Sequence, residues 1–302
     1  MTRVSIATIA LIASLIVGDT SLATNIPPQV KQVVAFIFIE RSDGKLVANG
    51  TAFFVGVPDE QNPERSYVYL VTAKHVLQKT EGGPFFPAVF VRLDKKDGSA
   101  ETVKLPIVAS GDKRTVFFHD DTTVDLAVFP ALPDEKIFDF KFLPASMVLE
   151  GDALQAHNIA EGTEVFFTGL FTPHVGEQRN YPIVRFGRVA LMTPERINWN
   201  GVKTELYLVE SGSYGGNSGS PVFFYLGADR LLGSITVGSP ELYLAGVMKG
   251  AFQEGRPIQV IPTSETPVSV ANIGIAAVVP APKLREILFG AELKRTRARP
   301  SK

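Results

Sequence analysis

The stretch Gly215-Gly216-Asn217-Ser218-Gly219-Ser220-Pro221 decides the fold class, because it is a serine-bearing turn between two segments with strand character. Leu206–Glu210 precedes it and Val222–Leu226 follows it. Glycine lets the backbone fold sharply around Ser218. The N–H groups of Gly216 and Ser218 can then converge on one oxygen atom. A short Gly-Ser string alone is equally typical of an ordinary loop. The prediction of a β protein with an exposed serine therefore rests on the length of this segment and on the two predicted strands that flank it.

Outward from this turn, short apolar runs and period-2 alternation dominate the chain, and turn-forming residues separate them. This pattern predicts an all-β protein with two antiparallel β-barrels. The first barrel is expected at about 31–135, a connection at about 136–161 and the second barrel at about 162–280. The candidate strands are Val33–Glu40, Gly50–Val57, Val68–Thr72, Phe86–Leu93, Leu126–Phe129, Glu164–Leu170, Ile183–Leu191, Leu206–Glu210, Val222–Leu226, Leu231–Val237, Leu242–Met248 and Gly274–Val279.

One short helix is expected after the last strand, at about 281–290. Leu284, Ile287 and Leu288 have the i, i+3, i+4 spacing of an apolar helical face, and Gly290 can end the helix. The residues from 291 to 302 are rich in basic side chains and predict a frayed, solvated tail, with a surface-binding arm as the alternative.

Composition excludes several classes of function. The formal net charge is −1, which gives no broad field for nucleic acid, so no nucleic-acid partner is predicted. The chain has no cysteine, which excludes a thiolate nucleophile, a thiolate metal site and a dithiol redox centre. We predict no metal site and no cofactor, and hydroxyl or carboxylate chemistry remains. The oligomeric state is not predictable from these features.

The N-terminus has the pattern of a targeting segment. Arg3 supplies a positive start, Val4–Gly18 is apolar, and Ser21-Leu22-Ala23 places small residues at a cleavage position. A signal peptide at 1–23 predicts an exported protein, periplasmic or secreted, and an uncleaved membrane anchor is the alternative. No later stretch is apolar enough to span a bilayer, so no stable membrane insertion is expected after cleavage. The sequence does not decide whether residues Thr24–Lys31 form a removable propeptide.

A hydroxyl nucleophile needs a base and an acid that orients this base. His75 stands at the end of a predicted strand, where a helical turn would begin, and Asp125 opens the apolar run 125–129. An acid anchored at a strand edge can be buried and held still, which favours Asp125 over Asp120 and Asp121. Of the other histidines, His119 is followed by Asp120 and Asp121, which only weakly indicates a metal site. His157 and His174 are expected on the surface.

These segments, in the order His, Asp, Ser, resemble the trypsin-like (chymotrypsin-fold) serine peptidases, with the closest match to bacterial glutamyl endopeptidases and Deg (HtrA)-type protease domains. The likeness runs from about Val33 to Phe289. It rests on Gly50-Thr51-Ala52-Phe53-Phe54-Val55, Val71-Thr72-Ala73-Lys74-His75-Val76, Asp125-Leu126-Ala127-Val128, Gly216-Asn217-Ser218-Gly219-Ser220-Pro221, the strand that opens at Gly162, and Asn272-Ile273-Gly274-Ile275-Ala276 with Pro280.

The resemblance implies a catalytic triad of Ser218, His75 and Asp125, with an oxyanion hole made by the N–H groups of Gly216 and Ser218. Asn217 stands where digestive relatives carry an acid, so activation by an ion pair with a new N-terminus is not expected. No PDZ domain is expected either, because few residues follow the predicted helix.

The primary specificity pocket is expected along the strand that contains Val247, Met248, Lys249 and Gly250. Lys249 either favours an acidic side chain before the cleaved bond or points into solvent. The sequence therefore predicts an exported serine endopeptidase acting on protein or peptide chains. The alternatives are a catalytically silent peptidase-fold binding or chaperone-like protein, and an esterase using the same triad.

Overall fold

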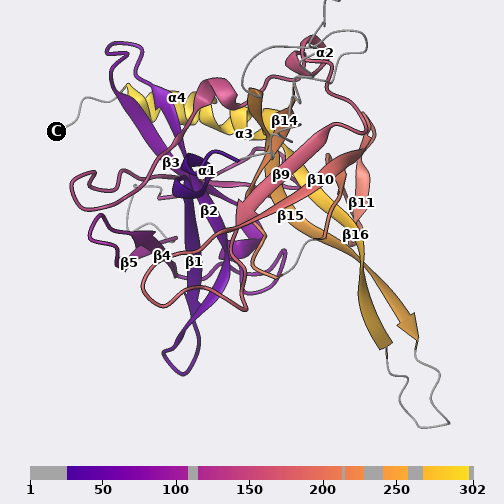
Figure 1. Cartoon of the computed structure of the whole chain (residues 1–302), viewed down its shortest axis with the longest axis horizontal. Coiled ribbons are helices and arrows are strands. Elements are labelled where there is room, and N and C mark those ends of the chain that lie inside the picture. The colour runs from indigo at the N-terminus through magenta and orange to yellow at the C-terminus, as the bar shows by residue number, and fades with distance from the viewer. Residues whose placement is uncertain (1–25, 108–114, 213–214, 228–240, 258–267, 299–302) are drawn as a thin grey trace, which may run out of the picture.

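The computed structural model describes residues 26–107, 115–212, 215–227, 241–257 and 268–298, with the backbone alone described at 254–257 and 268–271. The predicted signal peptide at 1–23 and the predicted strand Leu231–Val237 lie outside these ranges. Within them the protein is mostly β, which confirms the predicted fold class (Figure 1). No helix of the described part is long and apolar enough to cross a membrane.

The first half of the chain forms one eight-stranded sheet in the order β5-β4-β1-β2-β3-β7-β6, and β8 pairs with β2 in parallel. The short helix α1 (Gln29–Gln32) precedes it and the 3-10 helix η1 follows β3. The elements are β1 (Val34–Glu40), β2 (Leu46–Pro58), β3 (Ser66–Thr72), η1 (Lys74–Leu77), β4 (Ala88–Asp94), β5 (Ala100–Pro106), β6 (Phe117–Phe118), β7 (Ala127–Pro130) and β8 (Leu143–Pro144).

Hydrogen bonds close the second half into a barrel in the order β10-β13-β16-β15-β14-β9. In the first half, by contrast, the end strands β5 and β6 do not pair with each other within the described ranges, so the hydrogen bonds described there form a sheet and not a closed ring. β6 has only two residues, and the side chains of β5 are largely exposed, which leaves little to drive closure. The barrel strands are β9 (Glu164–Gly169), β10 (Ile183–Met192), β13 (Tyr207–Glu210), β14 (Pro221–Leu226), β15 (Glu241–Pro257) and β16 (Val268–Pro280).

Between these halves, the predicted connection carries only short elements, the 3-10 helix η2 (Ala145–Met147) and the helix α2 (Ala153–Ala156). A small hairpin, β11 (Ile197–Trp199) with β12 (Val202–Thr204), stands apart from the barrel in its own sheet. The ribbon of β15 and β16 continues beyond the barrel as a long projecting arm (Figure 1).

The central strands are apolar on both faces because each face packs into a different core. In β2, Phe53 and Val55 belong to the core shared by the two halves, whereas Ala52 and Phe54 belong to the core of the first half. A third cluster fills the second barrel. Continuous apolar runs are what a strand buried on two faces requires, which is why these strands were easy to predict.

The C-terminal segment differs from the prediction. The expected helix is present as α3 (Ala281–Leu288), but a second helix, α4 (Ala291–Arg297), replaces most of the expected frayed tail. Leu293 is buried in the shared core, and the Arg297 guanidinium donates to the Tyr69 hydroxyl at 3.0 Å. Tertiary contact on the first half therefore orders residues whose composition alone indicated solvent (Figure 1).

Candidate active site

His75 and Asp125 meet because the strands beside them pair. β3 and β7 are antiparallel, with Thr72 opposite Ala127, so the residues just after β3 lie beside those just before β7. The Nδ1 atom of His75 lies 2.6 Å from Asp125 Oδ2, and the His75 backbone N–H donates to Asp125 Oδ1 at 2.9 Å. One buried carboxylate thus holds both the ring and the main chain of one histidine, which leaves Nε2 for acid–base chemistry.

The turn around Ser218 is built on glycines with positive φ. Gly216 has φ 95° and Gly219 has φ 86°. At Gly219 a Cβ atom would lie only 2.0 Å from the Thr51 carbonyl oxygen, so no other residue fits. The Thr51 N–H donates to the Ser218 carbonyl at 2.8 Å, and the Gly219 N–H donates to the Met248 carbonyl at 2.8 Å. These bonds fix the turn against β2 on one side and β15 on the other.

The residues before Ser218 are anchored as well. The Thr51 hydroxyl donates to the Gly216 carbonyl, and the buried Asn217 side-chain amide donates to the Leu170 carbonyl, both at 2.8 Å. Among the described residues, the N–H groups of Gly216 and Ser218 make no hydrogen bond to a protein acceptor. The Ser218 hydroxyl itself donates to the Lys249 carbonyl at 3.0 Å.

Lys249 does not point into solvent, and here the structure corrects the sequence interpretation. Its side chain is only 5% exposed, and its Nζ atom lies 2.8 Å from Asp125 Oδ2 and 2.6 Å from Glu81 Oε1. β15 has a bulge between Met248 and Gly250, which breaks the alternation of inward and outward side chains at Lys249. Two carboxylates therefore already compensate the charge of Lys249, and its preference for an acidic substrate side chain stays a prediction.

The charges in this cluster stabilise one another. Although burial disfavours the carboxylate, His75 and Lys249 hold the pKa of Asp125 well below its usual range. Burial likewise disfavours the Lys249 ammonium, but Asp125 and Glu81 raise its pKa above the usual value. Burial also opposes ionisation of Glu81, yet its bonds to Lys249 and Trp199 lower its pKa. At neutral pH the cluster therefore holds one cation between two anions.

A cavity of about 730 Å³ opens beside these residues. His75, Ser218 and Lys249 line it, together with Gly250 and the residues that follow on β15 up to Gln253. Of the four predicted pocket residues, Lys249 and Gly250 are thus placed at the cavity. Val247 and Met248 are fully buried in the hydrophobic clusters instead, because both faces of β15 are covered at that point.

With this geometry established, comparison with known proteins assigns the chain to a family. The sequence model of the family described as "Trypsin-like peptidase domain" matches residues 50–230, which is more than half of the chain and includes His75, Asp125 and Ser218. The chain belongs to the trypsin-like peptidase family. The match ends before Lys249. The closer likeness to glutamyl endopeptidases and Deg-type domains stays a prediction.

Solved structures that are similar to this peptidase domain include the following two. The MamO protease domain from Magnetospirillum magneticum (apo form) is 15% identical, with 86% of this chain and 97% of that chain covered and a TM-score of 0.47. The scabies mite inactivated protease paralogue S-D1 is 10% identical, with 90% of this chain and 96% of that chain covered and a TM-score of 0.44. No curated protein matches the chain at a significant level.

Two residues at the site of this peptidase domain escaped the sequence analysis, Glu81 and Trp199. The Trp199 indole N–H donates to Glu81 Oε1 at 3.1 Å, and its ring lies edge-on to Phe252 at 4.9 Å between centroids. A hairpin signal was present in the chain, because Asn200-Gly201 separates the two short strands β11 and β12. Nothing in the local sequence indicated that this hairpin would lie over the cavity.

The remaining histidines are not among the residues that line the cavity beside Ser218. His119 Nε2 lies 2.7 Å from Glu286 Oε2, so this side chain links the first half to α3. His157 packs against Tyr243, and His174 against Tyr181. In the described part of the chain no three histidine or acidic side chains gather as a metal site would need.

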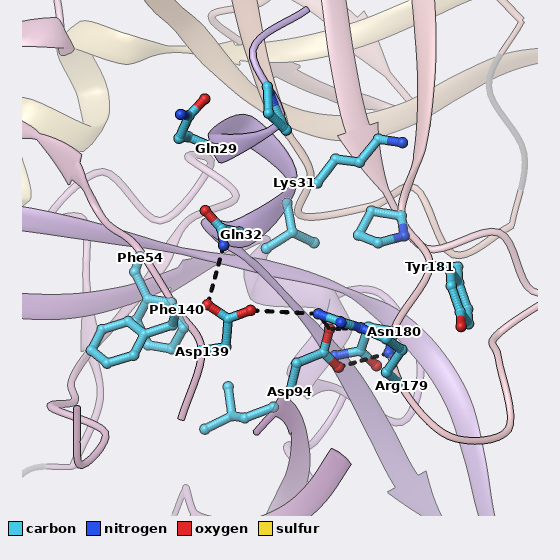
Figure 2. A pocket seen from close by; sticks show the side chains of 14 residues that line it. Gln29, Lys31, Gln32, Phe54, Asp94, Asp139, Phe140, Arg179, Asn180 and Tyr181 are labelled. Carbon is cyan, nitrogen blue, oxygen red and sulfur yellow. Dashed lines mark hydrogen bonds and ion pairs between the residues drawn. The ribbon is translucent and has the colours of Figure 1, made fainter. Parts of the chain in front are cut away.

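A second cavity, of about 680 Å³, lies between α1, the end of β4 and the loop before β10 (Figure 2). Its polar wall is an ion-pair cluster in which Arg179 contacts Asp94 at 3.2 Å and Asp139 at 3.5 Å. Gln32 of α1 donates to Asp139 at 3.1 Å, and the Asn180 N–H donates to Asp94 at 2.7 Å. These contacts tie α1 and the second half of the chain to β4, so the cluster serves the packing of the two halves.

Proposed function

We propose that this chain is a serine endopeptidase that cleaves protein or peptide chains, with Ser218 as nucleophile, His75 as general base and Asp125 as the acid that orients His75. The observation that carries the proposal is the pair of hydrogen bonds from His75 to Asp125 at 2.6 and 2.9 Å, beside Ser218 in one cavity. Such a pair fixes both the orientation and the tautomer of the imidazole.

In the proposed reaction, Ser218 Oγ forms a bond to the scissile carbonyl carbon while His75 Nε2 takes the hydroxyl proton. The N–H groups of Gly216 and Ser218 stabilise the oxyanion. His75 then returns the proton to the leaving amine as the C–N bond breaks. Water attacks the acyl-enzyme with His75 again as base, which releases the acid product and restores Ser218.

The resting position of the hydroxyl adds one step. Ser218 Oγ donates to the Lys249 carbonyl at 3.0 Å, so the proposed mechanism needs a rotation about χ1 that brings Oγ toward His75. A serine changes between staggered rotamers at small cost, and catalytic hydrogen bonds often tighten only when substrate is bound.

The shape of β15 supports a polypeptide substrate. β14 pairs with β15 only as far as Val247, and the following residues, Lys249 to Gln253, line the cavity. No described strand pairs with this edge of β15 beyond Val247, and an extended chain that adds to it would bring its backbone alongside Ser218. A site open along a strand edge suits cleavage within a chain.

Labelling with a fluorophosphonate probe tests the proposal directly. The wild-type protein is expected to be labelled, and Ser218→Ala is expected to lose labelling and at least about 10⁴-fold in casein hydrolysis. Ser220→Ala is the matched control, because its buried hydroxyl lies in the same turn and has no described hydrogen-bond partner. Equal labelling of the wild type and Ser218→Ala would refute the assignment, and turnover of simple esters without casein cleavage would favour an esterase.

A second candidate function is a peptidase-fold binding protein that does not turn over. The observation favouring it is the bond from the Ser218 hydroxyl to the Lys249 carbonyl in place of one to the imidazole. A folded wild-type protein that binds denatured casein but neither cleaves it nor reacts with the probe would establish this reading.

Export is part of the proposal and rests on the apolar segment Val4–Gly18 with the small residues before Thr24. Expression of the full chain in a bacterial host, followed by N-terminal sequencing of the exported product, is expected to show a chain that begins at Thr24. An intact, membrane-bound N-terminus would instead indicate the anchor.

A further inference from the structure

Lys249 contacts two members of the candidate triad, Asp125 through its side chain and Ser218 through its backbone carbonyl. Its side chain shares Asp125 Oδ2 with His75, at 2.8 Å from Nζ and 2.6 Å from Nδ1, while its carbonyl accepts the Ser218 hydroxyl. An ammonium and an imidazole therefore share one carboxylate oxygen of the candidate triad.

A buried lysine is costly unless its charge is compensated, so this arrangement needs support. Asp125 compensates Lys249 from inside the protein and Glu81 from the cavity side. Trp199 then holds Glu81 through its indole N–H, and its ring lies 5.2 Å from the ammonium. This cluster, which we call the Lys249 clamp, consists of Asp125, Lys249, Glu81 and Trp199.

Several other charges face the pair of His75 and Asp125. Lys74 precedes His75 on η1 and donates to the Thr122 carbonyl at 2.6 Å, and Asp121 lies in the segment before β7. Glu81 comes from the loop after η1, and Lys249 from β15. Lys249 is the cation in direct contact with Asp125, so its charge acts on the pair most strongly.

We propose that Lys249 is a positioning residue whose ammonium offsets the charge of Asp125 and so keeps His75 able to accept a proton in more acidic solution than Asp125 alone would allow. This inference rests on the proposed function. A bare carboxylate beside an imidazole favours the protonated ring, which cannot act as base. A cation on the same carboxylate oxygen weakens that preference.

The expected size of the effect follows from the geometry. Because both bonds end on one oxygen, the ammonium lies within about 5.5 Å of the imidazole, where a unit charge shifts a titration by up to about two pH units at an effective dielectric of about 20. Partial solvent access on the cavity side reduces this, so we expect a shift of about one unit.

Two substitutions are expected to move the acidic limb of the pH profile in opposite directions. Lys249→Met removes the cation, so the acidic limb of the labelling rate is expected to move about one pH unit upward. Glu81→Gln removes an anion near the site, so the limb is expected to move downward by a few tenths of a unit. Lys249→Arg keeps a cation at this position and should keep the acidic limb near its wild-type pH. Arg179→Met removes a cation from the separate cluster with Asp94 and Asp139 and should leave the acidic limb unchanged.

The charge effect is separable from folding and from catalysis. NMR titration of the His75 ring in a Ser218→Ala background reports the same shift without turnover, for both Lys249→Met and Glu81→Gln. Glu81 is 43% exposed, so Glu81→Gln is expected to fold even if Lys249→Met does not. If both variants titrate as the parent does, or shift in the same direction, the inference is wrong. Absence of Ser218-dependent labelling at every pH would refute the proposed function alone, since the NMR test stands without it.

Discussion

Two of the clusters in which one cation lies between two carboxylates, the Lys249 clamp and the cluster around Arg179, differ chiefly in the access of the cation to water. In the Lys249 clamp, the side chains of Lys249 and Asp125 are each 5% exposed, while Glu81, on the cavity side, is 43% exposed. In the other cluster, Arg179 is 37% exposed, Asp94 15% and Asp139 32% (Figure 2). The first lies against His75 and Ser218, and the second holds the two halves of the chain together.

The difference shows that burial decides what a triplet of charges can do. Water screens the Arg179 cluster, so its contacts give geometry and modest stability. Around Lys249 and Asp125 little water remains, so these two charges act strongly on each other and on any proton transferred beside them. The same charge pattern is structural in one place and suited to acid–base chemistry in the other.

The largest contrast is expected in activity. Asp125→Asn removes the acid that holds His75, and kcat is expected to fall about 10⁴-fold. The matched change Asp94→Asn lies in the other cluster, and kcat is expected to stay within about twofold. Peptide hydrolysis by the two folded variants measures this. A similar loss in both would show that the clusters do not differ in function as we propose.

A smaller contrast is expected in stability. Lys249→Met leaves Asp125 buried with one cation fewer, which is expected to cost about 3 kcal/mol in the free energy of unfolding. Arg179→Met breaks contacts that water partly replaces, so about 1 kcal/mol or less is expected. Urea unfolding of both variants in a Ser218→Ala background checks the order, and the reverse order would contradict the burial argument.

The smallest expected effect concerns the free energy of unfolding in acidic solution. Because folding lowers the pKa of Asp125, this carboxylate contributes stability above about pH 4. The contribution is lost as the pH falls toward the pKa that Asp125 has in the folded protein. Below pH 4 the free energy of unfolding is therefore expected to fall more steeply, by up to about 1.4 kcal/mol per pH unit, than in Asp125→Asn. Urea unfolding at pH 5, 4 and 3 in the Ser218→Ala background measures this, and equal slopes would contradict a strongly ionised Asp125.

Much of this fold was predictable because its strands carry strong local patterns. The runs around Phe53 and Val71 are apolar on both faces, and glycine is the residue that the turn at Gly219 requires. β5 was missed because its side chains are largely exposed, so no apolar pattern marks it. α4 was missed because a basic segment looks solvated until the surface that receives Leu293 is known.

The candidate site divides in the same way. By itself the sequence determined the order and local setting of His75, Asp125 and Ser218, because each sits in a short pattern of strand end or glycine turn. Only the tertiary structure decided where Lys249 points and which groups compensate it. A bulge in β15 reverses the side-chain alternation there, and Glu81 and Trp199 reach Lys249 from distant segments. Electrostatic contacts between residues far apart in a chain leave no local pattern, and these contacts set the chemistry that we propose for the site.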